Sequence, residues 1–147
     1  MRRLAAGLAC LMLLAGSAAA EVTAKSPNGF VNKSTVEIAA PPAKVWAALV
    51  TPAAWWNGAH SYSGDAARLT LEPKAGGCFC ERWPGGEVQH GVVVMAMPNS
   101  MMRLSGGLGP LQEMGAAAAW TIELKPSGAG TTLTHTLQVG GWSPGGF

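Results

Sequence analysis

Cys78 and Cys80, in the segment Gly-Cys-Phe-Cys-Glu, have the spacing in this chain that most suggests chemistry. Residues two apart on a β-strand point to the same face, so the two thiols would lie side by side. Three fates are open to them: small apolar packing, a short disulfide with a redox role, or metal ligation. Packing is favoured because cysteine is among the most buried residue types, and one Cys-x-Cys pair alone is weak support for zinc.

Two histidines fall on apolar faces of predicted strands. His90 alternates with valines in segment 87–97, and His135 alternates with leucines in segment 130–139. An imidazole among apolar side chains can orient a ligand or transfer a proton near neutral pH. The alternative, favoured for both, is a core histidine satisfied by a neighbouring polar group. His60 follows a tryptophan pair and could lie at a cavity mouth, and its position in the sequence is the only support for this placement.

Glu81 and Arg103 are the charged residues that could join a histidine inside a cavity. Glu81 shares a strand face with Phe79 and Trp83, whereas Arg82 points to the face of the cysteines. Arg103 follows two methionines on another predicted strand and could bind an acid or a ligand carboxylate. Ordinary cross-strand ion pairs are the simpler interpretation of both residues.

Tryptophan is frequent in this chain and charged residues are few, which fits a domain with an internal apolar cavity. The same composition also fits a chain that buries part of its surface against a missing segment or partner. The candidate cavity residues are Trp46, Trp55, Trp56, Cys78, Cys80, Glu81, His90, Arg103, Trp120 and His135.

Several catalytic signatures are missing from the sequence. The glycine-rich segment 106–110 lacks the Lys-Ser/Thr of a phosphate-binding loop and reads as a flexible hairpin or lid. Neither a Gly-x-Ser-x-Gly elbow nor a His-Glu-x-x-His motif occurs, so hydrolase and metalloprotease chemistry have no local support. We expect no cofactor and no metal.

The N-terminal segment reads as a cleavable secretory signal peptide at 1–20. Arg2 and Arg3 give it a positive start, the apolar run 4–14 is too short for a stable anchor, and Ala-Ala-Ala precedes cleavage after Ala20. Cleavage lowers Lys plus Arg from 10 to 8, which equals the 8 Asp plus Glu residues. A neutral, periplasmic or secreted chain is therefore expected, without electrostatic attraction for nucleic acid.

Alternation of apolar and polar residues predicts mostly strands. Residues 21–29 are expected to be a flexible lead-in, 30–39 a first strand, 43–50 a short helix and 53–58 a second short helical turn. Six further strands, separated by Gly- and Pro-rich turns, are expected at 67–73, 77–83, 87–97, 100–106, 116–125 and 130–139.

Particular local sequences accompany this order of elements. They are the strand-to-helix segment 36–46, the segment from Thr51-Pro52 to Trp55-Trp56, Glu72-Pro73 with Gly76-Gly77 and Phe79, and Gly130-Thr-Thr-Leu-Thr134. Together they resemble the START-like (SRPBCC) superfamily, and within it the branch of the activator of Hsp90 ATPase and the polyketide cyclases.

The resemblance implies an α+β helix-grip fold for the domain at 30–147. A curved antiparallel sheet of about seven strands would grip a long C-terminal helix, with an apolar cavity between them. The chain reaches Phe147 where that helix would begin, so we expect either a fragment or a naturally shortened chain. Without the helix, one face of the sheet would expose its apolar side.

Three functions follow from the resemblance and the residues. The first is a binding module for a lipid-like or aromatic small molecule, which is the function we predict. The second is an enzyme of cyclase or hydratase type that uses His90, His135 or Glu81 as acid or base. The third is a chaperone-partner role like that of the Hsp90 activator, against which export argues, because the periplasm holds neither ATP nor Hsp90. The expected partner is a small hydrophobic molecule, with no stable membrane anchor after signal cleavage.

Overall fold

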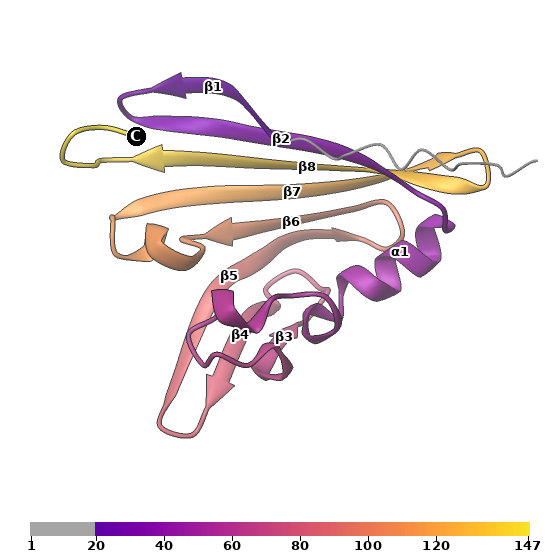
Figure 1. Ribbon diagram of the computed structural model, residues 1–147, viewed down its shortest axis with the longest axis horizontal. Coiled ribbons are helices and arrows are strands. Elements are labelled where there is room, and N and C mark those ends of the chain that lie inside the picture. The colour runs from indigo at the N-terminus through magenta and orange to yellow at the C-terminus, as the bar shows by residue number, and fades with distance from the viewer. Residues whose placement is uncertain (1–19) are drawn as a thin grey trace, which may run out of the picture.

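The strands of the computed structural model form one antiparallel sheet in the order β1-β2-β8-β7-β6-β5-β4-β3 (Figure 1). The structure describes residues 20–147, so all of the predicted signal peptide except Ala20 lies outside it. The bounds of the strands are β1 Glu21–Ser26, β2 Gly29–Ile38, β3 Leu69–Leu71, β4 Cys78–Trp83, β5 Gly86–Met97, β6 Met101–Gly106, β7 Ala116–Ser127 and β8 Gly130–Gly141.

The single α-helix of these residues, α1 Pro42–Leu49, lies across the concave side of the sheet (Figure 1). Pro42 starts it at a position where a missing backbone N–H costs nothing. Val45, Trp46 and Leu49 are its buried residues, at spacings that place them on one side. None of the helices in the described part of the chain has the length and apolar character needed to cross a membrane.

The second short helical turn expected at 53–58 is shorter than predicted and is a 3-10 turn, followed by further short turns. After α1 the chain makes η1 Pro52–Ala54, η2 Gly58–His60 and η3 Ala66–Arg68, and η4 Gly109–Gln112 comes before β7. Pro52, Asn57 and Gly58 fall within residues 51–58, which favours single turns over a continuous helix.

The segment predicted as a flexible lead-in is ordered, which corrects that expectation and gives eight strands in place of seven. Strand β1 pairs with β2 through a tight turn at Pro27 and Asn28. Every β1 residue is exposed, so backbone hydrogen bonds to β2 hold the strand. Without a buried face, the strand had no hydrophobic pattern for sequence reasoning to detect.

The six-strand meander predicted from residue 67 onward is confirmed, with β3 shorter than expected. Strand β5 departs from regular pairing at two points, opposite Phe79–Cys80 and between Val93 and Met95. Each such bulge adds a residue and bends the strand. Figure 1 shows β5 curving so that β3 and β4 turn toward the segment after α1.

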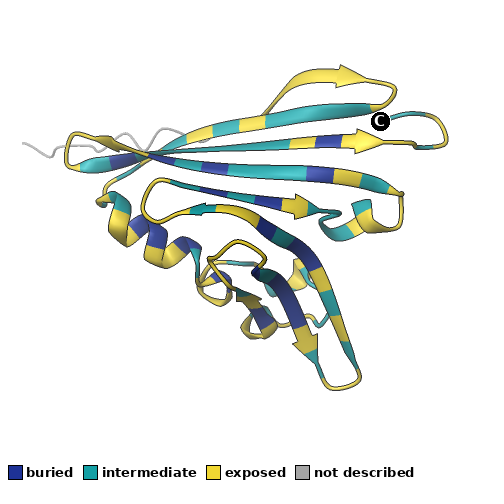
Figure 2. Ribbon diagram, turned by 180° about the vertical axis from the view of Figure 1, so that it is seen from behind, coloured by how far each residue is buried: buried dark blue, intermediate teal, exposed yellow. Residues whose placement is uncertain are grey.

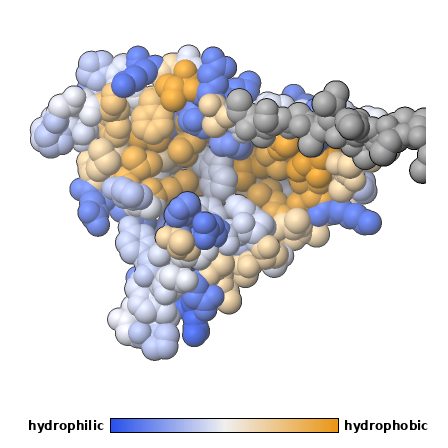
Figure 3. All heavy atoms as spheres, viewed as in Figure 1, coloured by the Kyte–Doolittle hydropathy of each residue, from blue (hydrophilic) through white to orange (hydrophobic). Residues whose placement is uncertain are grey.

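The core lies where the concave face of β4–β7 meets α1, and the buried residues in Figure 2 gather there. Val93 and Met102 have no exposed surface, and Leu104, Ile122 and Phe79 are nearly as buried. Residues 142–147, which follow β8, form no helix. The apolar hollow beside α1 is visible in Figure 3.

Candidate functional site

A cavity of about 390 Å³ lies between α1 and the strands β7 and β8. Its walls are almost wholly apolar, with Val45 and Leu49 from the helix and Ile122 and Leu133 from the sheet. Volumes of this order, lined by apolar side chains with a few polar groups, are typical of small-molecule sites. The remaining lining residues are Ile38, Ala48, Trp55, Trp120 and His135.

A second cavity of about 260 Å³ adjoins the first, because Trp55, Trp120 and His135 line both. Leu108 and Leu137 add to its apolar wall, together with Trp56. We call the two together the apolar cavity. Because the two spaces adjoin, their shape is compatible with an extended or branched apolar molecule.

Trp55 and Trp56 present ring surfaces at the apolar cavity, because backbone carbonyls already satisfy their indole N–H groups. Trp55 Nε1 donates to the carbonyl of Ala48 at 3.1 Å, and Trp56 Nε1 donates to the carbonyl of His60 at 3.1 Å. Trp56 also packs edge-on against Phe79. The ring faces therefore need no further polar partner and can contact an apolar ligand.

His135 is the ionisable residue of the apolar cavity. Its Nδ1 atom is buried and has no hydrogen-bond partner among the residues that the structure describes. Burial lowers the pKa of His135 below its usual value of 6.5, so the imidazole is neutral at pH 7. A neutral imidazole nitrogen without a partner is suited to a hydrogen bond with a ligand.

Glu81 and His90 form a second polar site, which lines neither part of the apolar cavity. Glu81 is completely buried on β4, and His90 Nε2 lies 3.1 Å from its carboxylate. The backbone N–H groups of Tyr62 and Ser63 donate to the same carboxylate. The pair therefore fixes the loop after η2.

The pKa of Glu81 reflects two opposing causes. Burial raises it, but hydrogen bonds from Ser63, Tyr62 and His90 favour the charged form and together bring the pKa below its usual value of 4.5. Glu81 is therefore ionised at neutral pH. A carboxylate with three committed donors stabilises a loop and is a poor proton acceptor.

His90 lies on the strand face of Val88, which pairs with Glu81, and its contact with the Glu81 carboxylate makes it the core histidine with a polar neighbour that the sequence favoured. A bulge follows at this point and changes the face of the later valines. Cys80 pairs with Gln89 while Phe79 pairs with Gly91, so His90 is an extra residue of β5. The expected alternation of His90 with Val92 and Val94 ends there, because the bulge shifts the strand by one residue.

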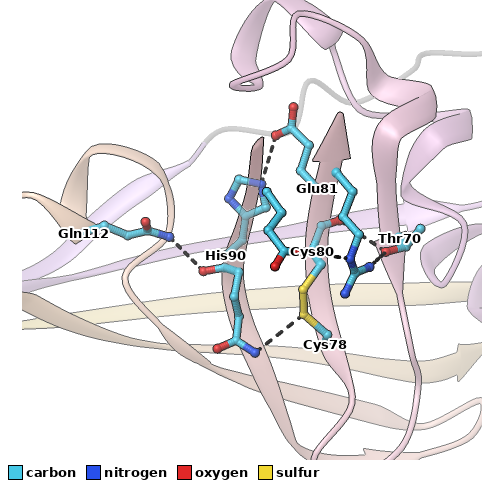
Figure 4. The surroundings of a disulfide bond; sticks show 9 residues. Thr70, Cys78, Cys80, Glu81, His90 and Gln112 are labelled. Carbon is cyan, nitrogen blue, oxygen red and sulfur yellow. Dashed lines mark hydrogen bonds and ion pairs between the residues drawn. A yellow bond between two sulfur atoms is a disulfide. The ribbon is translucent and has the colours of Figure 1, made fainter. Parts of the chain in front are cut away.

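Three predicted cavity residues lie on the convex face of the sheet. Cys78 and Cys80 are joined by a disulfide on β4 (Figure 4). Arg103 Nε donates to Thr121 Oγ1 at 2.9 Å. Their assignment to the cavity is thus corrected, because strand alternation turns their side chains to the opposite face.

Two other candidates, Trp46 and His60, lie outside the apolar cavity. Trp46 lies on the buried side of α1, in the core, and does not line the cavity. His60 is exposed and lines a separate pocket of about 540 Å³ with Tyr62 and Glu113.

The apolar lining was the part of the site that sequence reasoning missed. Val45 and Leu49 lie at helical spacing, while Ile122, Leu133 and Leu137 alternate on their strands. Those patterns indicate a core face but do not distinguish a filled core from an open cavity.

Comparisons with known proteins agree with this architecture. A family model described as "Activator of Hsp90 ATPase homolog 1-like protein" matches residues 39–145. None of the curated protein sequences matches the chain.

Solved structures share the fold at low sequence identity. CalU16 from Micromonospora echinospora is 18% identical with a TM-score of 0.51, over 85% of this chain and 71% of that chain. A protein from Rhizobium leguminosarum is 20% identical with a TM-score of 0.57, over 84% and 80% of the two chains. Mll3558 from Rhizobium loti is 27% identical with a TM-score of 0.52, over 76% and 80%. These likenesses confirm the helix-grip fold predicted from the sequence.

Proposed function

Because the chain belongs to the family of activator of Hsp90 ATPase homolog 1-like proteins, a family of START-like fold, we propose that it binds a small apolar molecule in the apolar cavity. The observation that carries the proposal is the combination of an apolar lining with one buried, unpartnered nitrogen, Nδ1 of His135. An unpaired buried polar atom costs free energy unless a partner arrives, and a ligand hydroxyl would supply one.

The class of ligand follows from the walls. Trp55 and Trp120 offer aromatic surface, whereas Leu133 and Leu49 offer aliphatic surface. Nothing in the lining provides a charge to balance an anion, because His135 is neutral at pH 7. The ligand is therefore an uncharged aromatic or lipid-like molecule with one hydrogen-bonding group.

A blocking substitution tests the proposal. Ala48 lines the cavity at its exposed rim, and Ala47, its neighbour, is exposed and does not line it. Ala48→Trp should lower the affinity for 2-naphthol by at least about ten-fold by filling the entrance, and Ala47→Trp should leave affinity unchanged. Equal affinity of the two variants would refute binding at this cavity.

An enzymatic role has one supporting observation, the neutral imidazole of His135. A histidine with a lowered pKa is unprotonated at neutral pH, as a general base must be before it reacts. Substitution separates the roles: His135→Asn should keep most of the affinity for an apolar ligand in a binding module, whereas it should abolish turnover in an enzyme.

We further propose that the protein is exported and acts outside the cytoplasm. The support is the positive start and short apolar run at residues 1–20, followed by small residues. N-terminal sequencing of the protein from the cell envelope or medium should give Glu21 as the first residue. A chain that retains Met1 in the cytoplasm would contradict export.

A further inference from the structure

A disulfide joins Cys78 and Cys80 on β4 (Figure 4). Strand alternation places it on the convex face of the sheet, and neither cysteine lines the apolar cavity. We infer that the disulfide is a thiol-exchange site, where an external thiol attacks Cys78 Sγ and reduces the pair reversibly. The inference does not depend on the proposed function, because neither cysteine lines the apolar cavity.

The short span of the bridge is the first support. Only Phe79 separates the two cysteines, so the bond closes a minimal loop and restricts the unfolded chain very little. A disulfide with so small a structural contribution can open without unfolding the domain. Disulfides with an accessible sulfur are more readily reduced than fully buried structural ones, and Cys78 is only half-buried.

The backbone spacing at the bridge is the second support. The Cα atoms of Cys78 and Cys80 lie 5.4 Å apart. Two residues of regular strand span about 6.7 Å, so β4 is contracted at this point. The shift in β4–β5 pairing falls between Phe79 and Cys80, inside the same three residues. The bridge and the bulge therefore occupy one place in the sheet.

The two sulfur atoms differ in access, which decides the direction of attack. Cys78 is half-buried and Cys80 is almost fully buried, with 5% of its surface exposed. The side-chain amide of Gln89 lies 3.6 Å from Cys78 Sγ and can donate to a thiolate there. Arg82, the next residue on this face, is held by Glu87 and Thr70.

The exchange balances with a named co-reactant, a small thiol such as glutathione. Its thiolate attacks Cys78 Sγ, the bond between Cys78 and Cys80 breaks, and the electron pair goes to Cys80 Sγ, which takes up a proton. A second thiolate then attacks the mixed disulfide on the outer sulfur and releases Cys78 as a thiolate, which is protonated. Two thiols are oxidised to one disulfide, and the protein gains two thiols.

Reduction of the bridge can change the position of the buried Glu81–His90 pair through the contacts of Phe79. Phe79 lies between the cysteines and packs against both His90 and Trp56, with ring centroids 5.1 and 5.6 Å apart. Opening the bridge permits β4 to extend until the Cα atoms of Cys78 and Cys80 reach the spacing of a regular strand. The extra residue opposite it, His90, would then shift relative to Glu81.

The first test is a glutathione titration of the full chain carrying Cys10→Ser, so that only Cys78 and Cys80 are counted. Samples are quenched with an alkylating agent and weighed by mass spectrometry. We expect both thiols to become labelled together in a glutathione buffer that leaves structural disulfides intact. Two thiols in the air-oxidised protein, or a bridge that survives this buffer, would overturn the inference.

Matched single variants test which sulfur is attacked. In Cys80→Ser the remaining Cys78 should react with glutathione disulfide at least about ten-fold faster than the remaining Cys80 does in Cys78→Ser. Equal rates, or a faster Cys80, would overturn the assignment. Reduction of the bridged protein should also move the indole N–H resonance of Trp56 while Trp142, exposed at the far end of β8, stays in place.

Discussion

Replacing Glu81 by glutamine tests whether this buried carboxylate holds the loop after η2. The carboxylate is fully buried and accepts backbone N–H groups from Tyr62 and Ser63, with His90 Nε2 at 3.1 Å. Glutamine has nearly the same shape but only one acceptor oxygen. Its amide nitrogen is a donor, so at least one of the three donors loses its partner.

The loss of stability follows from these contacts. A hydrogen bond to a charged group contributes about 1.5–3 kcal/mol, and an unpaired buried donor adds its desolvation penalty. The remaining bonds weaken because the charge is gone, so we expect the free energy of unfolding to fall by about 3 kcal/mol. For a domain of this size the corresponding drop in Tm is about 10–15 °C.

Urea unfolding of both proteins at pH 7 measures this change. Glu87→Gln is the matched control, because Glu87 is exposed and pairs only with Arg82 at 3.2 Å. A surface pair of this kind is worth less than about 1 kcal/mol. If Glu81→Gln loses no more stability than Glu87→Gln, the carboxylate does not hold the loop and the reasoning is wrong.

Three other predictions concern titration and buried polar groups. Because burial lowers the pKa of His135 below 6.5, the unfolded chain binds the proton first, so stability should fall as the pH drops below about 6.5 and level off below the folded pKa. His135→Leu should remove this part of the pH dependence. It should also stabilise the protein at pH 7 by up to about 1 kcal/mol, since it removes an unpaired nitrogen. If urea unfolding finds the variant less stable, Nδ1 has a partner. Hydrogen bonds lower the pKa of Glu81, so they stabilise the folded protein fully above pH 4.5, and this stability is lost as the pH falls through the folded pKa. Acid titration should not find this loss in Glu81→Gln. Thr131→Val should lower the free energy of unfolding by about 1–2 kcal/mol, because the fully buried hydroxyl donates to the Ala40 carbonyl at 2.7 Å. The control Thr134→Val should lower it by less than about 0.5 kcal/mol in urea unfolding. Equal losses in the two variants would contradict this role of Thr131.

The sheet was predictable from alternation wherever the pairing is regular. His135 lies with Leu133 and Leu137 as expected, because β8 pairs with β7 and β2 without a bulge. The valines after His90 were assigned to the wrong face, since the extra residue in β5 reverses the alternation after it. A bulge depends on the pairing of two strands, and no local pattern in one strand reveals it.

The contacts of Glu81 could not be derived from the sequence, because its donors come from a loop about twenty residues earlier. Its strand face, shared with Phe79, was correctly predicted from alternation. The apolar cavity needs the helix and two strands placed in three dimensions. The sequence predicted its tryptophans and His135 as candidates, while the aliphatic walls looked like ordinary core.

The most direct test of binding in the apolar cavity is a nitrogen-15 NMR titration with 2-naphthol, an uncharged aromatic alcohol. Binding there should shift the resonances of the indole N–H groups of Trp55 and Trp120 and of the ring nitrogens of His135, with Trp83 and Trp142 unaffected. Shifts confined to Trp83 and Trp142, or no saturable change at His135, would contradict binding in this cavity.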